Sequence, residues 1–109
     1  MADRIPDEAL VIRGGKNRPT DIKRGMGKHP SGIFGISVEC ALDIEIGNLA
    51  APLPHTEIGV TTAGKIREAG GDVIRTSGRS PNHATLIGLT PEVASRLFAP
   101  TIANPAKRA

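Results

Sequence analysis

The scarcity of aromatic residues is the feature that most constrains how this chain can fold. Among 109 residues there are two Phe, no Trp and no Tyr, whereas Gly occurs 13 times and Pro nine times. About 39% of the residues are hydrophobic, which is enough for a modest core. That core must be built from Ile, Leu, Val and Ala, each of which buries less area than an aromatic ring. The length predicts a single domain.

The same composition argues against several classes of function. A platform that stacks the bases of single-stranded nucleic acid needs exposed rings, and we expect Phe34 and Phe98 both to be buried. The single cysteine, Cys40, excludes an internal disulfide and argues against haem, iron–sulfur and structural zinc sites. The three histidines lie too far apart in sequence to form a local metal motif. We therefore expect no metal and no cofactor.

Alternation of apolar and polar residues predicts five strands. It is clearest in residues 33–40, where Phe34, Ile36 and Val38 alternate with glycine and polar residues. The other expected strands are residues 9–13, 57–61, 72–76 and 82–89. Because turn-forming residues separate the last two, we expect them to form a hairpin.

Helices are expected between these strands. Asp43, Thr62 and Thr90 are suitable N-cap residues for three of them, and Pro19 is suited to begin a further short helix. This order predicts an α+β domain with a mixed sheet of about five strands, three to four short helices, and a C-terminal hairpin followed by a helix. Residues 9–100 form this domain, between a flexible lead-in at residues 1–8 and an extended tail at residues 101–109.

Charge is divided unevenly along the chain. Residues 13–28 contain six Lys or Arg against one acid, whereas residues 39–57 contain four acids and no Lys or Arg. The basic stretch is suited to binding phosphate. Its candidate phosphate-binding residues are Lys16, Arg18, Lys23 and Arg24. A solvated surface with no binding role is the alternative interpretation.

The expected hairpin at residues 72–89 carries a second group of candidates. Alternation places His83 on the face opposite the most apolar side chains, with Arg75 on the partner strand and Arg79 in the turn. A histidine transfers protons near neutral pH, and guanidinium groups stabilise the charge that develops on a phosphate during reaction. We therefore interpret His83, Arg79 and Arg13 as candidate catalytic residues and Arg75 as a candidate phosphate-binding residue.

Two resemblances bear on function. Residues 11–15, V-I-R-G-G, resemble the opening strand of ADP-ribosyltransferase-like domains, and residues 58–86 resemble the ending of the RNA 2′-phosphotransferase branch of that group. This resemblance implies that Arg13 binds the phosphate of a nicotinamide dinucleotide, with Ser37 or Glu39 on the second strand.

Most of the chain also resembles a family of small bacterial proteins. The segments that carry this resemblance are residues 11–15, 60–64, 78–83 and, imperfectly, 103–105. It implies no particular activity. Short reading frames of this kind occur in two-gene modules, which favours a toxin-like or accessory role.

Together these patterns predict a small toxin-like bacterial protein that acts on RNA or a nucleotide through an Arg/His phosphate site, without a metal. One alternative is a non-catalytic basic binding module, an accessory or regulatory protein that engages nucleic acid or a cognate protein partner. Another is a divergent ADP-ribosyltransferase-like domain. The sequence contains neither an apolar leader nor a long apolar run, so we expect a cytoplasmic protein without a membrane partner. The oligomeric state stays open.

Overall fold

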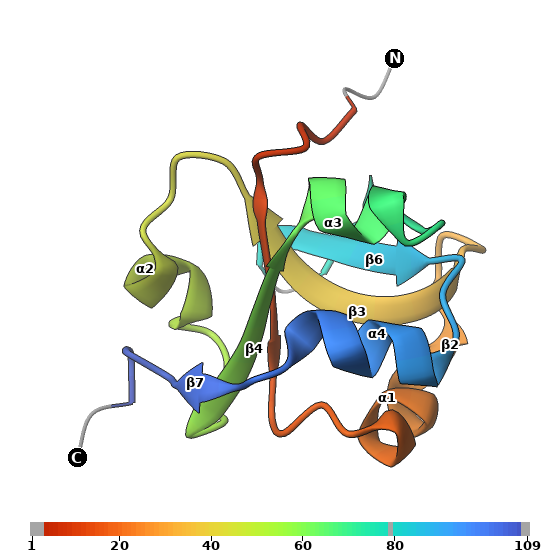
Figure 1. Cartoon of the computed structure of the whole chain (residues 1–109). Coiled ribbons are helices and arrows are strands. Elements are labelled where there is room, and N and C mark those ends of the chain that lie inside the picture. Colours follow the sequence, from red (N-terminus) through yellow and green to blue (C-terminus); the bar gives the residue numbers. More distant parts are fainter. Residues whose placement is uncertain (1–3, 79, 108–109) are drawn as a thin grey trace.

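The computed structural model describes residues 4–78 and 80–107 and has an α+β architecture (Figure 1). Within these residues seven strands form one sheet, and four short helices pack against it. The strands are β1 (Leu10–Gly14), β2 (Met26–Lys28), β3 (Phe34–Ala41), β4 (Glu57–Thr62), β5 (Asp72–Arg75), β6 (His83–Ile87) and β7 (Ile102–Ala103). The helices are α1 (Pro19–Gly25), α2 (Ile46–Ala50), α3 (Ala63–Glu68) and α4 (Pro91–Phe98).

The sheet is antiparallel at every pairing found among the described residues. The strand order is β5–β6–β3–β1–β4–β7, and β2 pairs with β3 off this path. This corrects the expectation of a mixed sheet of about five strands. The strands β3 and β4, which α2 connects, run parallel to each other, but β1 lies between them and is antiparallel to both. The helical connection therefore skips one strand.

One edge of β3 is shared by two different strands. On this edge β2 pairs with residues 34–36 and β1 pairs with residues 39–41, whereas β6 occupies the opposite edge along residues 36–39. Ser37 and Val38 fall between the two pairings and have no described partner strand on the shared side. The sheet therefore opens between β1 and β2, and the segment that contains α1 bridges the opening.

The five strands predicted from alternation are confirmed as β1, β3, β4, β5 and β6, and the C-terminal hairpin of β5 and β6 precedes α4 as expected. The two additional strands were missed because they are too short for a periodic signal. The strand β2 is Met-Gly-Lys, and β7 has two residues.

Two of the three predicted helix caps are confirmed. The hydroxyl oxygen of Thr62 accepts from the Lys65 amide at 3.2 Å at the start of α3, and that of Thr90 accepts from the Val93 amide at 3.2 Å at the start of α4. The third is wrong, because Asp43 adopts a left-handed φ of 61° three residues before α2 and Glu45 is the residue at its N-terminus.

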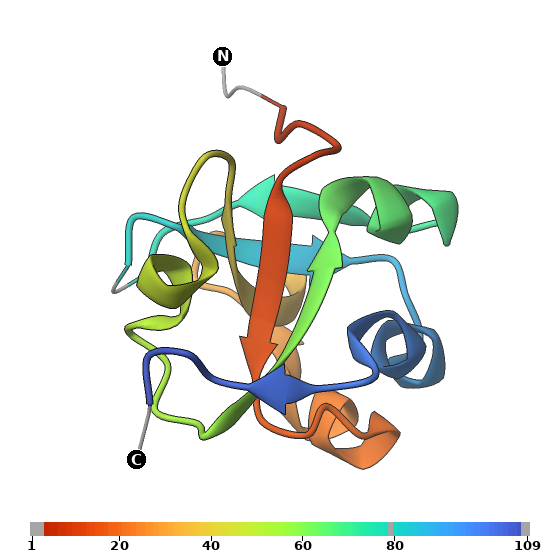
Figure 2. The same cartoon turned by 60° about the vertical axis from the view of Figure 1, so that its left-hand side comes forward.

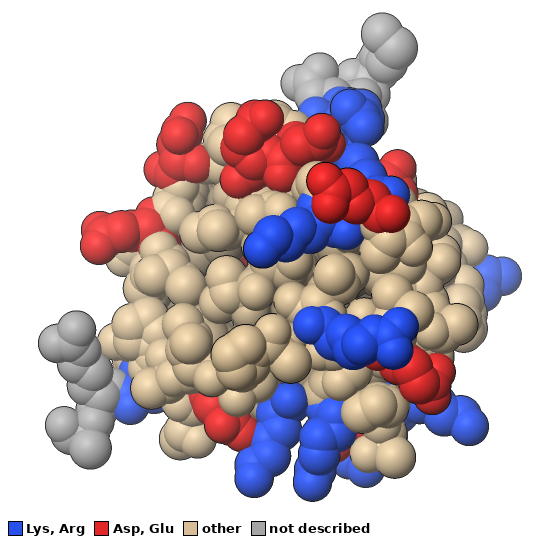
Figure 3. All heavy atoms as spheres, viewed as in Figure 1, with Lys and Arg blue, Asp and Glu red and all other residues tan. Residues whose placement is uncertain are grey.

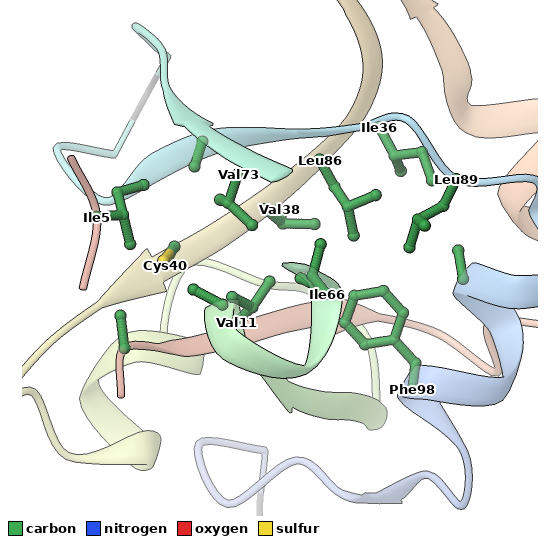
Figure 4. Close-up of a cluster of buried hydrophobic side chains, with 14 of the residues drawn as sticks. Ile5, Val11, Ile36, Val38, Cys40, Ile66, Val73, Leu86, Leu89 and Phe98 are labelled. Atoms are coloured by element: carbon green, nitrogen blue, oxygen red, sulfur yellow. The ribbon is translucent and has the colours of Figure 1, made fainter. Parts of the chain in front are cut away.

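The larger core lies on one face of the sheet beneath α1, α3 and α4. It is almost entirely aliphatic, with Phe98 as its one aromatic ring (Figure 4). Phe98 is 0% exposed and lies beside Ile66 of α3 and Val11 of β1. The single cysteine belongs to the same cluster, and burial raises the pKa of the Cys40 thiol. These observations agree with Cys40 as a small apolar core residue.

The opposite face of the sheet is only partly covered. The helix α2 packs there over β1 and the Ala41 end of β3, and its Leu49 joins a smaller cluster with Ile12 of β1 and Ile58 of β4. In Figure 2, α2 lies on one side of β1 and β4, whereas α3 and α4 lie on the other. The cluster on this face includes no residue of β6. Polar side chains are therefore tolerated there.

Phe34 does not occupy the buried position that alternation predicted, because it is 60% exposed. It opposes Lys28 at the far end of β3, beyond the last residue of β3 that pairs with β6. At that position no neighbouring strand or helix covers its ring among the described residues. The premise that both rings are buried is thus wrong, and so is the exclusion of ring stacking that rested on it.

Described residues on both sides of residues 9–100 contact the domain. Before it, Ile5 is 5% exposed and packs in the larger core. In the C-terminal segment β7 extends the sheet, and the buried side chain of Asn104 donates to the carbonyl oxygen of His55 at 2.9 Å.

The two phenylalanines allow a matched test of this core. We expect Phe98→Ala to lower the free energy of unfolding by about 3–5 kcal/mol, because it leaves a cavity in an otherwise aliphatic cluster. Phe34→Ala should change it by less than about 0.5 kcal/mol, because the ring is mostly exposed. Urea unfolding followed by far-ultraviolet circular dichroism measures both values. Similar losses in the two variants would contradict the placement of Phe34.

Candidate functional site

A basic pocket of about 580 Å³ lies where the sheet opens between β1 and β2. Its walls come from the end of β1, the loop that follows it, α1, Ser37 of β3 and the segment before β4. The lining residues are Arg13, Gly14, Gly15, Lys16, Arg18, Asp21, Arg24, Gly25, Ser37, Leu53 and His55. We call this space the basic pocket.

Four cationic side chains line the basic pocket, against the single acid Asp21. They are Arg13, Lys16, Arg18 and Arg24. The predicted phosphate-binding stretch thus contributes three of its four residues to the basic pocket and adds Arg13, whereas Lys23 of α1 is exposed and is not among the lining residues described. Figure 3 shows Lys and Arg gathered at the lower edge of the molecule, where Figure 1 places α1.

Asn17 holds the β1–α1 loop in place. Its side chain is 1% exposed and donates to the carbonyl oxygens of Arg13 at 2.9 Å and Gly15 at 3.1 Å. Its Oδ1 accepts from the Arg13 guanidinium at 2.7 Å, and its carbonyl oxygen accepts from the Ser95 hydroxyl at 2.6 Å. Burial lowers the pKa of Arg13, while nearby Asp21 acts in the opposite direction. Asn17 therefore orients a partly desolvated cation toward the basic pocket.

The two glycines that end β1 make room for an imidazole. A Cβ atom on Gly14 would collide with the His55 ring, and one on Gly15 would contact the same ring. Two adjacent glycines permit a close approach at this position, and the ring of His55 makes it. His55 is exposed at the rim of the basic pocket.

The one acid in the basic pocket is paired. Asp21 accepts from the backbone amide of Arg18 at 3.1 Å and from its guanidinium at 2.8 Å. The hydrogen bond from the Arg18 side chain lowers the pKa of Asp21 and raises that of Arg18. The carboxylate thereby fixes the start of α1 and one of the four cations.

Two smaller hollows adjoin the basic pocket, and Ser37 lines all three spaces. One, of about 220 Å³, is shared between Arg13 on β1, Glu39 on β3 and His83 on β6; we call it the His83 hollow. The other, of about 230 Å³, lies beside the turn between β2 and β3 and is lined by His29 and Thr85. The three spaces thus meet at Ser37, and we call them together the groove.

His83 is held with one ring nitrogen engaged. Its Nδ1 lies 2.8 Å from the hydroxyl of Thr76, which is 3.0 Å from the hydroxyl of Thr85. The ring of His29 packs at 5.4 Å from that of His83. As predicted, Ala84 faces the buried core while His83 lies on the other face.

The two arginines of the hairpin do not join His83 in the described site. Arg75 opposes Ala84 and donates to the carbonyl oxygen of Cys40 at 2.8 Å, so its guanidinium is engaged on the face away from His83. It lines none of the three spaces described here. Arg79 lies outside the described residues, and its role stays a prediction.

Three residues of this site were not assigned from sequence: Asn17, His55 and, apart from the family resemblance, Glu39. An asparagine after a Gly-Gly pair is a signal for a left-handed residue, and Asn17 has a φ of 56°. No local pattern indicates that His55, some forty residues from Gly14, packs against it. No group of three or more His, Cys, Asp or Glu side chains in the described part of the chain is arranged to hold a metal ion.

Comparison with known proteins gave no match to a family model, a curated protein or a solved structure. Within the described ranges, none of the helices has the length and apolar character needed to cross a bilayer. Function must therefore be argued from the groove itself.

The role of Asn17 is testable by stability. We expect Asn17→Ala to lower the free energy of unfolding by about 2–3 kcal/mol, because it removes three hydrogen bonds and because alanine adopts the left-handed conformation less readily than asparagine. Asn17→Gly should lose less, by about 1 kcal/mol, because glycine adopts that conformation freely. Urea unfolding measures both. Asn48→Ala, at an exposed position of α2, is the control, and an equal effect there would contradict a specific role for Asn17.

The Arg18–Asp21 pair predicts a pH dependence. The pKa of Asp21 is lowered in the folded state, so its contribution to stability is present above the unfolded value of about 4 and is lost as the pH falls through the folded pKa. The difference in unfolding free energy between the wild type and Asp21→Asn should therefore shrink as the pH is lowered from about 6 to about 2. Chemical unfolding across this range measures it, and a constant difference would show that the pair contributes nothing.

Proposed function

We propose that this protein binds the phosphate groups of RNA or of a nucleotide in the basic pocket and acts on them without a metal ion. The observation that carries the proposal is the convergence of Arg13, Lys16, Arg18 and Arg24 on one pocket of about 580 Å³. This volume is within the usual range for ligand sites. Guanidinium groups present planar pairs of donors that match phosphate oxygens.

The positions of these cations favour an extended anion over a single small one. Arg13 lines both the basic pocket and the His83 hollow, whereas Arg18, at the N-cap of α1, and Arg24, within α1, line the basic pocket alone. A chain of phosphates that contacts α1 can continue past Arg13 toward His83. This arrangement supports RNA as the ligand, with Arg13 and His83 in the candidate catalytic positions. Arg79 stays part of that prediction.

The biological setting of the proposal comes from the resemblance to small bacterial proteins. We propose a toxin-like factor of the cytoplasm, with a cognate protein partner as the source of control. In the non-catalytic alternative, the same basic pocket engages nucleic acid or a protein as an accessory module. The uneven charge, with basic residues near α1, supports both versions.

A second candidate function follows from one observation. The His83 hollow contains Arg13, Ser37 and Glu39 together, the three residues that the ADP-ribosyltransferase resemblance singles out. A nicotinamide dinucleotide would then be the ligand, and its phosphates would lie against Arg13. This candidate requires that the dinucleotide compete with RNA for the same cations.

Salt dependence tests the proposed phosphate contacts. With about three phosphates neutralised, log Kd for single-stranded RNA should change with a slope near 2 against log salt, or roughly 20-fold in affinity from about 50 to 200 mM salt. Arg18→Gln and Arg24→Gln should each weaken binding and reduce the slope by roughly 0.7. Fluorescence anisotropy with a labelled random-sequence RNA measures both quantities.

The control for this experiment is Lys65→Gln, which removes an exposed charge from α3, outside the basic pocket. It should leave the slope unchanged. A slope near zero, or equal losses in the control, would overturn the phosphate-binding proposal. Displacement of RNA by a nicotinamide dinucleotide, but not by the corresponding mononucleotide, would favour the second candidate.

A further inference from the structure

Glu39 is a buried carboxylate that the described part of the fold leaves unsatisfied. Its residue is 7% exposed, and its Oε1 has no hydrogen-bond partner among the described residues. Buried carboxylates are costly unless they are paired or hydrogen-bonded, and exceptions need an explanation. Glu39 lines the His83 hollow, so this carboxylate borders a space that a ligand can enter. A bound ligand that donates a hydrogen bond would satisfy it.

Glu39 and His83 stand directly opposite each other on neighbouring strands. Directly opposed residues of an antiparallel pair point to the same face, with their Cβ atoms about 4.5–5.5 Å apart. The Nδ1 atom of His83 is engaged by Thr76, while its Nε2 has no described hydrogen-bond partner. The His83 hollow thus contains one proton acceptor and one proton carrier side by side.

The neighbouring groups are already engaged, so Glu39 and His83 remain as the proton acceptor and the proton carrier. Nδ1 of His29 accepts from the Ser31 amide at 3.0 Å, so in the neutral ring the proton is on Nε2, which donates to the carbonyl oxygen of Ser77 at 2.6 Å. Both nitrogens of His29 are therefore engaged, and its ring supports that of His83. Arg13 also lines the His83 hollow, and Asn17 holds its guanidinium through a hydrogen bond of 2.7 Å.

We propose that Glu39 and His83 are the general base and general acid of a metal-independent RNA cleavage reaction. The inference rests on the proposed function and names its substrate class, a ribonucleotide chain with a free 2′-hydroxyl. Glu39 accepts the proton of that hydroxyl as the 2′-oxygen forms a bond to phosphorus. The bond from phosphorus to the 5′-oxygen breaks, and the His83 imidazolium gives its proton to the departing oxygen. The products are a 2′,3′-cyclic phosphate and a 5′-hydroxyl end.

Each element of the groove has a part in this reaction. Arg13 neutralises the charge on the pentavalent phosphorus, and the cations of α1 hold the neighbouring phosphates. Because RNA supplies its own nucleophile, the site needs only the acid, the base and this cation. An acid or base positioned in this way contributes about 10²- to 10⁴-fold to a rate.

The test uses a random-sequence RNA pool incubated with the full chain in the presence of EDTA, with product ends identified by mass spectrometry. We expect cyclic phosphate and 5′-hydroxyl ends. Glu39→Gln and His83→Asn should each slow cleavage by about 100-fold or more while RNA affinity stays within about twofold of the wild type. The wild-type rate should show a bell-shaped pH profile, whose acidic limb is lost in Glu39→Gln and whose alkaline limb is lost in His83→Asn.

Two controls separate catalysis from folding. Glu39→Gln keeps the shape of the side chain and removes a buried charge, so its unfolding midpoint should equal or exceed that of the wild type. Glu68→Gln, at an exposed position of α3, should leave cleavage unchanged. The wild type itself offers a test that needs no variant, because a 2′-O-methyl pool should bind and stay intact.

The failures of the two proposals are distinguishable. Binding of the unmodified pool without cleavage of any member would overturn the catalytic inference and leave phosphate binding intact. Unchanged cleavage in Glu39→Gln, or cleavage of the 2′-O-methyl pool, would overturn the assignment of the base. Absence of salt-sensitive binding would overturn the proposed function as well.

Discussion

The structure depends on how one edge of β3 is divided between two partners. Because β1 pairs with one end of that edge and β2 with the other, Ser37 and Val38 face an opening in the sheet. The segment between β1 and β2 must bridge this opening, and it contains three of the four cations of the basic pocket. Asn17 closes its first turn back onto Arg13. A local interruption of strand pairing thus produces both the pocket and its charge.

The two faces of the sheet are covered unequally by helices, which explains why the candidate catalytic side chains lie on one face. Three helices bury aliphatic side chains against one face, with Phe98 as the only ring in that cluster. On the other face the single helix α2 covers β1 and one end of β3, and the apolar cluster beneath it includes no residue of β6. Polar residues such as Ser37 and His83 occupy this side of the sheet at little cost in free energy, because water or a bound ligand can form hydrogen bonds with them. Glu39 is the exception, because it is buried there and its Oε1 has no hydrogen-bond partner in the described part of the chain.

Sequence predicted what depends on neighbouring residues and missed what depends on distant ones. The five longer strands and the caps at Thr62 and Thr90 follow from local periodicity and local hydrogen bonding, and they are confirmed. Whether Phe34 and Phe98 are buried depends instead on which segments lie above each strand. Alternation therefore predicts the burial of Ile36 correctly and that of Phe34 wrongly. Lys16, Arg18 and Arg24 could be predicted as binding residues from the charge of their segment alone. The contact between His55 and Gly14 could not be predicted, because no sequence pattern links the two segments.

The contact between Gly14 and His55 restricts how this chain can diverge. Any side chain at position 14 occupies the volume of the imidazole, so the two positions cannot vary independently. A change at position 14 is tolerated only in a background where residue 55 has already become small, so this order is the only neutral path between the two states. In an evolving set of sequences, these two sites should therefore change as a pair, with the glycine as the later of the two to be replaced.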